Sequence, residues 1–357
     1  MFRFLTAGES HGPALTAIIE GVPAGLTLDL EQINTDLARR QQGFGRGGRM
    51  KIEKDNAQVM SGVRFGCTLG SPLTIVVANR DWENWQERMA VFGEPQGDRI
   101  TAPRPGHADL PGILKYQRQD IRDILERASA RETAARVAVG SIAKQLLSAA
   151  GITVTSTVTN IGGATAEAAM VDAVAAAKAA GDTLGGIFVV NAKGLVPGLG
   201  SHVQWDRRLD TRLAAAVMSI QAIKGVEFGA GFAYAGLPGS QAHDEIYFDT
   251  GRGYYRRTNN AGGIEGGISN GEDIVLQAVM KAIPTLMQPL DTVNIIDKTA
   301  VKANTERSDV CAVSAAAVVG EAMVAIVLAQ VLLEKFGGDS IDDLIAALEN
   351  YKTRINK

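Results

Sequence analysis

The 357-residue chain has few of the residues that build disulfide scaffolds, stacking surfaces or strongly charged faces. Its two cysteines, Cys67 and Cys311, belong to no CxxC pair, so neither a disulfide framework nor a thiolate zinc site is indicated. Aromatic residues make up only 5%, which disfavours the stacking platforms of single-strand nucleic-acid binders. A net charge of -3 gives no overall field that attracts nucleic acid or an anionic membrane. Any anion site is therefore expected to be built locally.

We also expect no leader segment and no membrane-spanning helix. Residues 1–6 contain an arginine and no apolar core, so no secretory signal is expected. In the most hydrophobic stretch, 314–336, only twelve uncharged residues separate Glu321 from Glu334, whereas a bilayer requires about 20. We expect a buried core helix there, no membrane partner and a cytoplasmic protein.

Glycine is the residue in excess, with 40 of 357 positions. Periodicity and turn residues predict helices and strands that do not alternate strictly and are not divided by a Pro- or Ser-rich linker. The expected helices are 28–42, 123–150, 165–180, 207–223, 314–336 and 340–351, and the expected strands include 3–6, 15–20, 152–159, 187–192 and 245–248. This pattern predicts a single α+β domain over residues 1–357, with antiparallel sheets packed on helices of small residues.

The first motif is GESHG at residues 8–12, which matches the G-x-S-x-G turn of the α/β-hydrolases. It would make Ser10 the nucleophile of a serine hydrolase. That turn must lead from a strand into a helix, whereas residues 15–20 have the pattern of a second strand and only seven residues precede the motif. The context argues against a hydrolase, which is kept as an alternative.

The second motif is RRQQGFGRGGR at residues 39–49, where four arginines are interleaved with glycine. Gly43, Gly45 and Gly48 satisfy the dinucleotide fingerprint G-x-G-x-x-G, but a helix rather than a strand is expected before them, so a Rossmann site is not indicated. Guanidinium and backbone N–H groups in such a segment can close around phosphate or carboxylate. An RNA-contacting segment is the alternative, which the low pI and few aromatic residues disfavour.

Further candidate groups occur in RPGHAD at residues 104–109 and RASARET at 127–133. His11 and His107 each lie in a glycine-flanked turn, where an imidazole can exchange protons with a ligand near neutral pH. A glycine-rich segment, 259–271, offers bare backbone to a large ligand. No spacing typical of a metal site occurs, so no metal is expected.

Taken in order, these segments closely resemble the chorismate synthase family over nearly the whole chain. The resemblance rests on GESHG (8–12), RRQQGFGRGGRM (39–50), RPGHADL (104–110), RASARETAARVAVG (127–140), KGVEFG (224–229), NNAGGIEGG (259–267) and RSDVCAV (307–313). The family comprises carbon–oxygen lyases acting on phosphates. They convert 5-enolpyruvylshikimate 3-phosphate to chorismate by 1,4-anti elimination of phosphate, in the last step of the shikimate pathway that feeds aromatic amino acid biosynthesis. The resemblance implies this reaction here, with reduced FMN required although no net redox change occurs.

The resemblance also implies roles for individual residues. The substrate carries two carboxylates and a phosphate, which calls for several arginines. Arg40, Arg46, Arg104 and Arg131 are the expected substrate-binding residues, with Arg49 as a further candidate. The implied catalytic residues are His11, which protonates the departing phosphate, His107, which lies against the reduced flavin near N1, and Asp309, which assists proton removal through flavin N5.

Cofactor contacts are carried over in the same way. The implied FMN-binding residues are Arg127, Ala128, Ser129, Gln221, Ala222, Gly266, Lys281, Ala282, Ile283, Pro284, Thr285 and Arg307. The family further implies a homotetramer and a sandwich of helices between antiparallel sheets. Because no reductase domain is recognisable in the chain, we expect an external flavin reductase or another source of reduced flavin. NADP-dependent reduction by the chain itself stays open.

Three positions depart from the family's usual pattern. Ala282 replaces the proline of a lysine-proline pair, Thr183 replaces the serine of an aspartate-serine pair, and Ser314 replaces the proline after the Cys-Ala-Val run. None of the three is an expected catalytic group. We expect them to affect local loop geometry and FMN affinity, because a lost proline raises the unfolded-state entropy of a loop.

Overall fold

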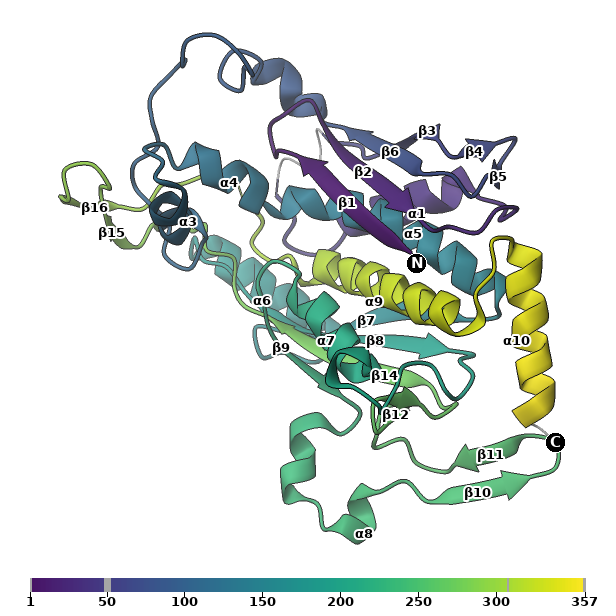
Figure 1. The fold of residues 1–357 in the computed structure, drawn as a ribbon. Helices are drawn as coiled ribbons and strands as arrows, with labels where there is room; N and C mark the ends of the chain where they lie inside the picture. The colour runs from purple at the N-terminus through teal and green to yellow at the C-terminus, as the bar shows by residue number, and fades with distance from the viewer. Residues whose placement is uncertain (1, 48–52, 307, 356–357) are drawn as a thin grey trace.

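Two four-stranded antiparallel sheets frame the molecule in the computed structural model, which describes residues 2–47, 53–306 and 308–355. The first sheet has the strand order β1-β2-β6-β3 and the second the order β7-β8-β14-β9 (Figure 1). Their bounds are β1 (Arg3–Gly8), β2 (Ala14–Glu20), β3 (Ala57–Ser61), β6 (Leu73–Ala78), β7 (Thr153–Ile161), β8 (Gly186–Lys193), β9 (Ile223–Phe228) and β14 (Ile274–Met280). Alternate residues of β2, namely Leu15, Ala17 and Ile19, are buried, as expected where one sheet face covers a core.

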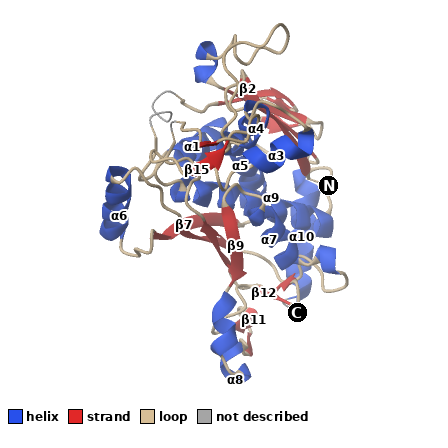
Figure 2. Ribbon diagram, turned by 90° about the vertical axis from the view of Figure 1, so that its left-hand side faces the viewer, coloured by secondary structure: helices blue, strands red, loops and turns tan. Residues whose placement is uncertain are grey.

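Helices lie between the two sheets (Figures 1 and 2). They are α1 (Leu30–Gln41), α5 (Thr133–Ala149), α7 (Leu209–Met218) and α9 (Val313–Phe336). α5 packs on β2 and β6, α9 packs on β7 and β8, and α5 and α9 pack on each other. Their approach is close because a Cβ added to Gly140 of α5 would lie 2.3 Å from the Cβ of Ala322. The small residues of these helices therefore allow the layers to meet backbone to backbone.

α9 is the one helix, among the described residues, that is long and apolar enough to cross a membrane, and 94% of its apolar window is buried inside the fold. The expected core helix is confirmed. Glu321, near its middle, is buried and accepts hydrogen bonds from Arg39 at 2.6 Å and Lys144 at 3.1 Å. Its charge is paired inside the core, as a buried carboxylate requires.

The remaining elements lie around this frame. The short 3-10 helices are η1 (Arg80–Asn84), η2 (Ala130–Glu132), η3 (Trp205–Arg207) and η4 (Gly231–Gly236). The other helices are α3 (Asp109–Tyr116), α4 (Arg122–Ala128), α6 (Glu167–Ala179), α8 (Gly239–Ala242) and α10 (Ile341–Ile355). The short strand pairs are β4 (Val63–Arg64) with β5 (Cys67–Thr68), β10 (Ile246–Asp249) with β11 (Gly253–Arg256), β12 (Ile264–Glu265) with β13 (Ile268–Ser269), and β15 (Asp291–Val293) with β16 (Ala300–Lys302). α8 and the β10–β11 hairpin project from the body (Figure 1).

The mixed helix-and-sheet character expected from the sequence is confirmed, as are the helices over 28–42, 165–180, 314–336 and 340–351 to within a few residues. The helix expected over 207–223 ends earlier, at Met218, because Ile223 begins β9. The single helix expected over 123–150 is wrong. It is two helices, α4 and α5, separated at Ser129 and by η2, and this break helps to form the pocket described next.

Candidate active site

A cavity of about 740 Å³ opens where segments from both halves of the chain converge. Loops and helix ends provide most of its lining, as is usual for sites carried on a rigid frame. The predicted residues that line it are Ser10, His11, Arg40, Arg46, Arg104, His107, Ala128, Ser129, Arg131, Gln221, Ala222, Lys281, Ile283, Pro284, Thr285 and Asp309. The structure thus brings together all three predicted catalytic residues and all four predicted substrate-binding arginines.

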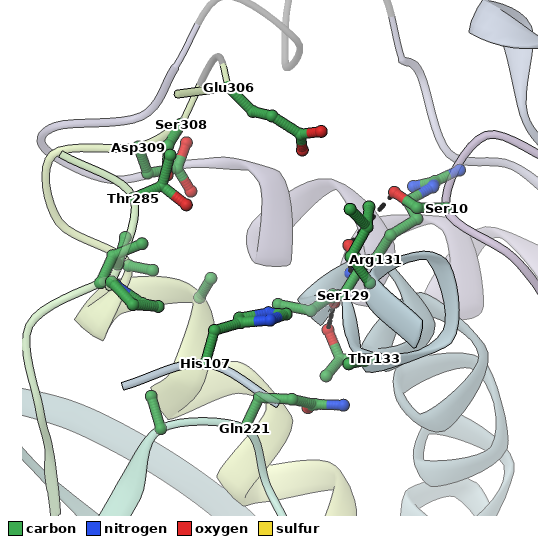
Figure 3. Close-up of a pocket in the computed structure, with 18 of the residues that line it drawn as sticks. Ser10, His107, Ser129, Arg131, Thr133, Gln221, Thr285, Glu306, Ser308 and Asp309 are labelled. Carbon is green, nitrogen blue, oxygen red and sulfur yellow. Dashed lines mark hydrogen bonds between the residues drawn. The ribbon is translucent and has the colours of Figure 1, made fainter. Parts of the chain in front are cut away.

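The break between α4 and α5 provides one wall of this pocket. Ser129 has an extended backbone, with ψ near 140°, and its hydroxyl accepts a hydrogen bond from the N–H of Arg131 at 3.2 Å. The same hydroxyl donates to Ser10 at 3.1 Å. Figure 3 shows Ser10, Ser129 and Arg131 across the pocket from Thr285 and Asp309. The helix-favouring composition of this segment conceals the break, since only the serine cap at Ser129 indicates it.

His11 is held by the buried carboxylate of Glu126. Its Nδ1 lies 2.9 Å from Glu126 Oε1, and its backbone N–H donates to Oε2 at 2.8 Å. Burial raises the pKa of Glu126, but the hydrogen bonds and charge of His11 and the charge of Arg122 outweigh it, so the pKa lies below its usual value. An ionised carboxylate can only accept, so Nδ1 carries the hydrogen. Nε2 is the ring nitrogen that does not bond to Glu126, and it can exchange a proton with a bound ligand.

His107 is held in the same manner by Asp109, which is fully buried. Its Nδ1 lies 2.5 Å from Asp109 Oδ1, and Arg104 donates to the same carboxylate from Nε at 2.8 Å and Nη2 at 3.0 Å. Burial acts to raise the pKa of Asp109, but the hydrogen bonds from His107 and Arg104 hold it well below its usual range. One ionised carboxylate therefore fixes a predicted catalytic histidine and a predicted substrate-binding arginine.

Arg40 and Arg131 share the carboxylate of Asp55. Asp55 accepts from Arg40 Nη2 at 2.7 Å and from Arg131 Nη1 at 2.5 Å. Burial acts to raise the pKa of Asp55, but the charges and hydrogen bonds of the two guanidinium groups lower it by more, so the net shift is downward. Arg40 is 3% exposed, and its Nε has no hydrogen-bond partner in the described part of the chain. A buried guanidinium that borders the cavity with an unused donor fits an anionic ligand.

Arg46 and Asp309 pair directly with each other. The guanidinium Nη1 donates to Asp309 Oδ2, and the N–H of Gly47 donates to Oδ1 at 2.5 Å. Among the described lining residues, five cationic side chains stand against three carboxylates, so the cavity surface offers more guanidinium and ammonium donors than carboxylate acceptors. Clustered N–H donors of this kind suit a small polyanion.

Three of the expected cofactor contacts are not lining residues of the pocket, and a fourth lies outside the described residues. Arg127 is not brought to the pocket lining, because its Nη2 donates to the carbonyl of Thr6 at 3.0 Å on β1. Gly266 lies at the turn between β12 and β13, also outside the lining. Ala282 belongs to the lining segment 281–285 but is not itself a lining residue. Arg307 lies outside the described residues, as do Gly48 and Arg49.

The pocket offers groups that suit a flavin. Gln221 Oε1 is a buried acceptor with no hydrogen-bond partner in the part of the chain that the structure describes. An apolar wall for a planar ring is provided by Ile220, Met280, Ile283, Ala312, Ala315, Ala316 and Val319. A buried acceptor that lacks a donor is costly unless a ligand supplies one, and the N–H of a flavin ring is such a donor. The residues present therefore fit the expected cofactor.

Sequence reasoning missed the carboxylates that position these groups. Glu126 and Asp55 lie outside every motif singled out, and Asp109 was only part of a quoted segment. Trp85 was missed as well, although its ring lies 4.1 Å from that of His11. Charged residues next to the arginine motifs were the available signal, because a buried guanidinium requires a partner.

The structure disfavours the two alternatives, a serine hydrolase that uses Ser10 and an RNA-contacting arginine segment. GESHG joins β1 to β2, two antiparallel strands, so Ser10 does not lie on the strand-to-helix turn of a hydrolase. In the arginine motif, Arg40 is buried in the pocket and Arg39 is bonded to Glu321 in the core. These two guanidinium groups are committed to carboxylates of the fold, which disfavours an RNA contact through them.

Two of the departures from the family pattern, Thr183 and Ser314, contact segments that lead to the site. Thr183 is 7% exposed and donates from its hydroxyl to the carbonyl of Ile283 at 2.7 Å, which ties it to segment 281–285. Ser314 lies so close to Gly43 that a Cβ on that glycine would be 2.5 Å from the serine Cβ. Gly43 also has a positive φ of 115°, so both space and backbone conformation require glycine there.

The pocket combines buried arginines, carboxylate-bonded histidines and a largely apolar wall, the groups expected of an enzyme site for a small anion. The family model of chorismate synthase matches residues 2–333. The chorismate synthases of Geobacter sulfurreducens and Aquifex aeolicus are 56% and 53% identical to the chain, covering 98% and 99% of it and 98% of each relative. A crystal structure titled as chorismate synthase superposes with a TM-score of 0.80 at 44% identity, over 99% of this chain and 98% of that one.

The chain therefore belongs to the chorismate synthase family, and with it to the carbon–oxygen lyases that act on phosphates (EC 4.2.3.5).

Proposed function

We propose that the chain is a single catalytic domain that converts 5-enolpyruvylshikimate 3-phosphate to chorismate and phosphate by an FMN-dependent 1,4-anti elimination. The observation that carries the proposal is the shared cavity. It joins His11, His107 and Asp309 to four arginines that arrive from three separate segments of the chain. Family membership supports the same assignment.

The arginines bind and orient the substrate. Arg40, Arg104 and Arg131 are each 7% exposed or less and are fixed by buried carboxylates, so little side-chain entropy is lost when they bind an anion. Arg46 completes the set beside Asp309. Three anionic groups on the substrate match this clustered positive charge.

His11 is the proton donor to the departing phosphate. Its Nδ1 is engaged by Glu126, so Nε2 is the nitrogen that delivers the proton. Asp309 takes part in removal of the proton from the substrate ring, and Arg46 and the N–H of Gly47 keep that carboxylate oriented. His107, fixed by Asp109, is the imidazole assigned to the reduced cofactor.

Reduced FMN, when bound, supplies electron density to the substrate and returns to its starting oxidation state. Gln221, Ser129 and segment 281–285 would hold it, with the apolar wall around Ala316 excluding water from the reacting groups. Arg127, Gly266 and Arg307 remain proposed cofactor contacts on the strength of the family pattern. We also propose a cytoplasmic homotetramer supplied with flavin by an external reductase or another source of reduced flavin.

Dependence on the reduced cofactor tests this proposal. Under oxygen-free conditions, phosphate release from 5-enolpyruvylshikimate 3-phosphate is measured with reduced FMN, with oxidised FMN and without flavin. Release only with reduced FMN is the expected result. Gln221→Ala is expected to weaken reduced-FMN binding by about 10-fold, the effect of one lost hydrogen bond of about 1 kcal/mol or slightly more. Release that is equal in all three conditions would contradict the proposal.

A further inference from the structure

Glu126 makes contacts to His11 that no other described carboxylate duplicates. It is 3% exposed and does not line the cavity. Its two oxygens lie 2.9 and 3.1 Å from His11 Nδ1, and one also accepts the His11 backbone N–H at 2.8 Å. Its own backbone carbonyl accepts the N–H of Ser10 at 3.1 Å. One residue of α4 therefore fixes both the backbone and the ring of His11.

Glu126 holds the His11 ring at the Nδ1 edge, and a second residue packs against the ring itself. Trp85 lies against it with a centroid separation of 4.1 Å and an interplanar angle of 31°. Trp85 is held by a hydrogen bond from its Nε1 to Asp81 at 3.2 Å and by the guanidinium of Arg122, which lies 4.8 Å from its ring centroid. Arg122 in turn donates to Glu126 at 2.6 Å. The imidazole is thus confined between a carboxylate and an indole that share one arginine.

We propose that Glu126 is a positioning residue for the elimination, which keeps the hydrogen on His11 Nδ1 and presents a protonated Nε2 to the phosphate. This inference rests on the proposed function of His11 as the proton donor. A general acid transfers its proton efficiently when its tautomer and ring direction are fixed and the acceptor lies within hydrogen-bond reach. The negative charge of Glu126 also stabilises the imidazolium form that donates the proton.

Other charges near His11 are present but do not replace Glu126. Arg122 offsets part of the Glu126 charge, and Arg122 is also 3.5 Å from Glu306 at the pocket edge. Asp81 borders the same cavity. Glu9 lies two residues away, and burial together with Glu126 and Asp123 raises its pKa. Glu126 is the carboxylate bonded to the ring through Nδ1, so removing its charge changes the proton affinity of Nε2 most directly.

The test compares Glu126→Gln, which keeps the side-chain volume and removes the charge, with Glu126→Asp, which keeps the charge. Glu321→Gln is the matched control, because it removes an equally buried carboxylate away from the cavity. For Glu126→Gln we expect kcat to fall about 100-fold, the lower end of a general-acid contribution, with KM changed less than about threefold. The basic limb of its kcat–pH profile is expected to move to lower pH. Glu126→Asp is expected to recover part of both effects.

A readout that does not need turnover separates this inference from the proposed function. The chain has four histidines, so ¹⁵N-histidine labelling gives few signals, which His11→Gln assigns. We expect the titration midpoint of the His11 signals to move to lower pH in Glu126→Gln and to stay in place in Glu321→Gln. An unmoved midpoint in Glu126→Gln together with a wild-type pH profile would overturn the inference. A moved midpoint in a protein that forms no chorismate would contradict the proposed function and leave the His11–Glu126 coupling intact.

Discussion

Asp309, which is expected to assist proton removal, and Arg46, which is expected to bind the substrate, are bonded to each other in the folded protein. The guanidinium donates to one oxygen of the carboxylate, and the N–H of Gly47 donates to the other. Asp309 is 18% exposed in its side chain and Arg46 is 10% exposed, so the pair borders the cavity and is not screened as a surface pair would be. An anionic substrate that binds Arg46 through the same nitrogen would therefore compete with Asp309 for it.

This competition predicts different kinetic effects for the two partners. Asp309→Asn is expected to lower kcat about 100-fold, because a proton acceptor is lost, while KM stays the same or falls as Arg46 is released to the substrate. Arg46→Ala is expected to raise KM about 10-fold or more, the effect of a charged hydrogen bond. Steady-state kinetics under saturating reduced FMN measure both. A raised KM with unchanged kcat in Asp309→Asn would contradict the assigned roles.

The core ion pair of α9 predicts a pH-dependent stability. Burial acts to raise the pKa of Glu321, but its bonds and charges with Arg39 and Lys144 lower it below the unfolded value of about 4.3. The stabilisation is therefore complete above that value and is lost as pH falls through the folded pKa. At pH 7 we expect Glu321→Gln to lower the free energy of unfolding by about 2–4 kcal/mol, somewhat less than for fully buried pairs because Arg39 is partly exposed.

Urea denaturation at several pH values measures this effect. The difference between wild type and Glu321→Gln is expected to shrink on acidification below about pH 4. Glu20→Gln is the control, since the Arg3–Glu20 pair is exposed and is expected to contribute less than about 1 kcal/mol. A difference that is independent of pH would show that the carboxylate charge is not the source of the stabilisation.

The close approach of α5 and α9 predicts that Gly140 does not tolerate a methyl group. An added Cβ would lie 2.4 Å from the Cα of Ala322, and neither helix backbone can move away without opening the core. Gly140→Ala is expected to lower the free energy of unfolding by about 1–3 kcal/mol despite the better helix propensity of alanine. Gly236→Ala, where nothing lies within 4 Å, is expected to stay within about 0.5 kcal/mol of wild type. Equal thermal stability of the two variants would refute the packing argument.

The hydrogen bond of Thr183 predicts that its hydroxyl, and not its methyl group, helps segment 281–285 to bind the cofactor. Its donation to the carbonyl of Ile283 would be lost in Thr183→Val and kept in Thr183→Ser. Thr183→Val is expected to weaken reduced-FMN binding several-fold, because one net hydrogen bond contributes about 1 kcal/mol to holding the segment. Anaerobic flavin titration with fluorescence detection compares the variants. Equally weakened binding in both variants would assign the effect to packing.

Much of the frame could be predicted from the sequence because its signals are local. The apolar run of α9 and the serine before α10 identify those helices, and Ser340 does bond to Asp343 at 2.7 Å. The break at Ser129 was not predicted, since alanine and arginine on both sides favour a continuous helix and the serine alone is a weak signal. Its conformation depends on contacts with Ser10, more than one hundred residues earlier.

The site, like the frame, could be predicted from the sequence only in part. Arginines and histidines in unusual glycine-rich segments are visible in the sequence, and the family resemblance gives their order. The carboxylates that orient them are not visible, because Asp55 meets Arg131 and Glu126 meets His11 only through the tertiary fold. Which arginine faces the cavity is likewise decided by folding, since Arg39 pairs with Glu321 while its neighbour Arg40 lines the pocket.

The most direct test of the central claim follows both products and the flavin in one oxygen-free reaction. The protein is mixed with reduced FMN and 5-enolpyruvylshikimate 3-phosphate, and chorismate, phosphate and flavin absorbance are recorded together. The account predicts equal amounts of chorismate and phosphate with no net flavin oxidation over many turnovers. Phosphate released without chorismate, or flavin oxidised in proportion to product, would contradict it.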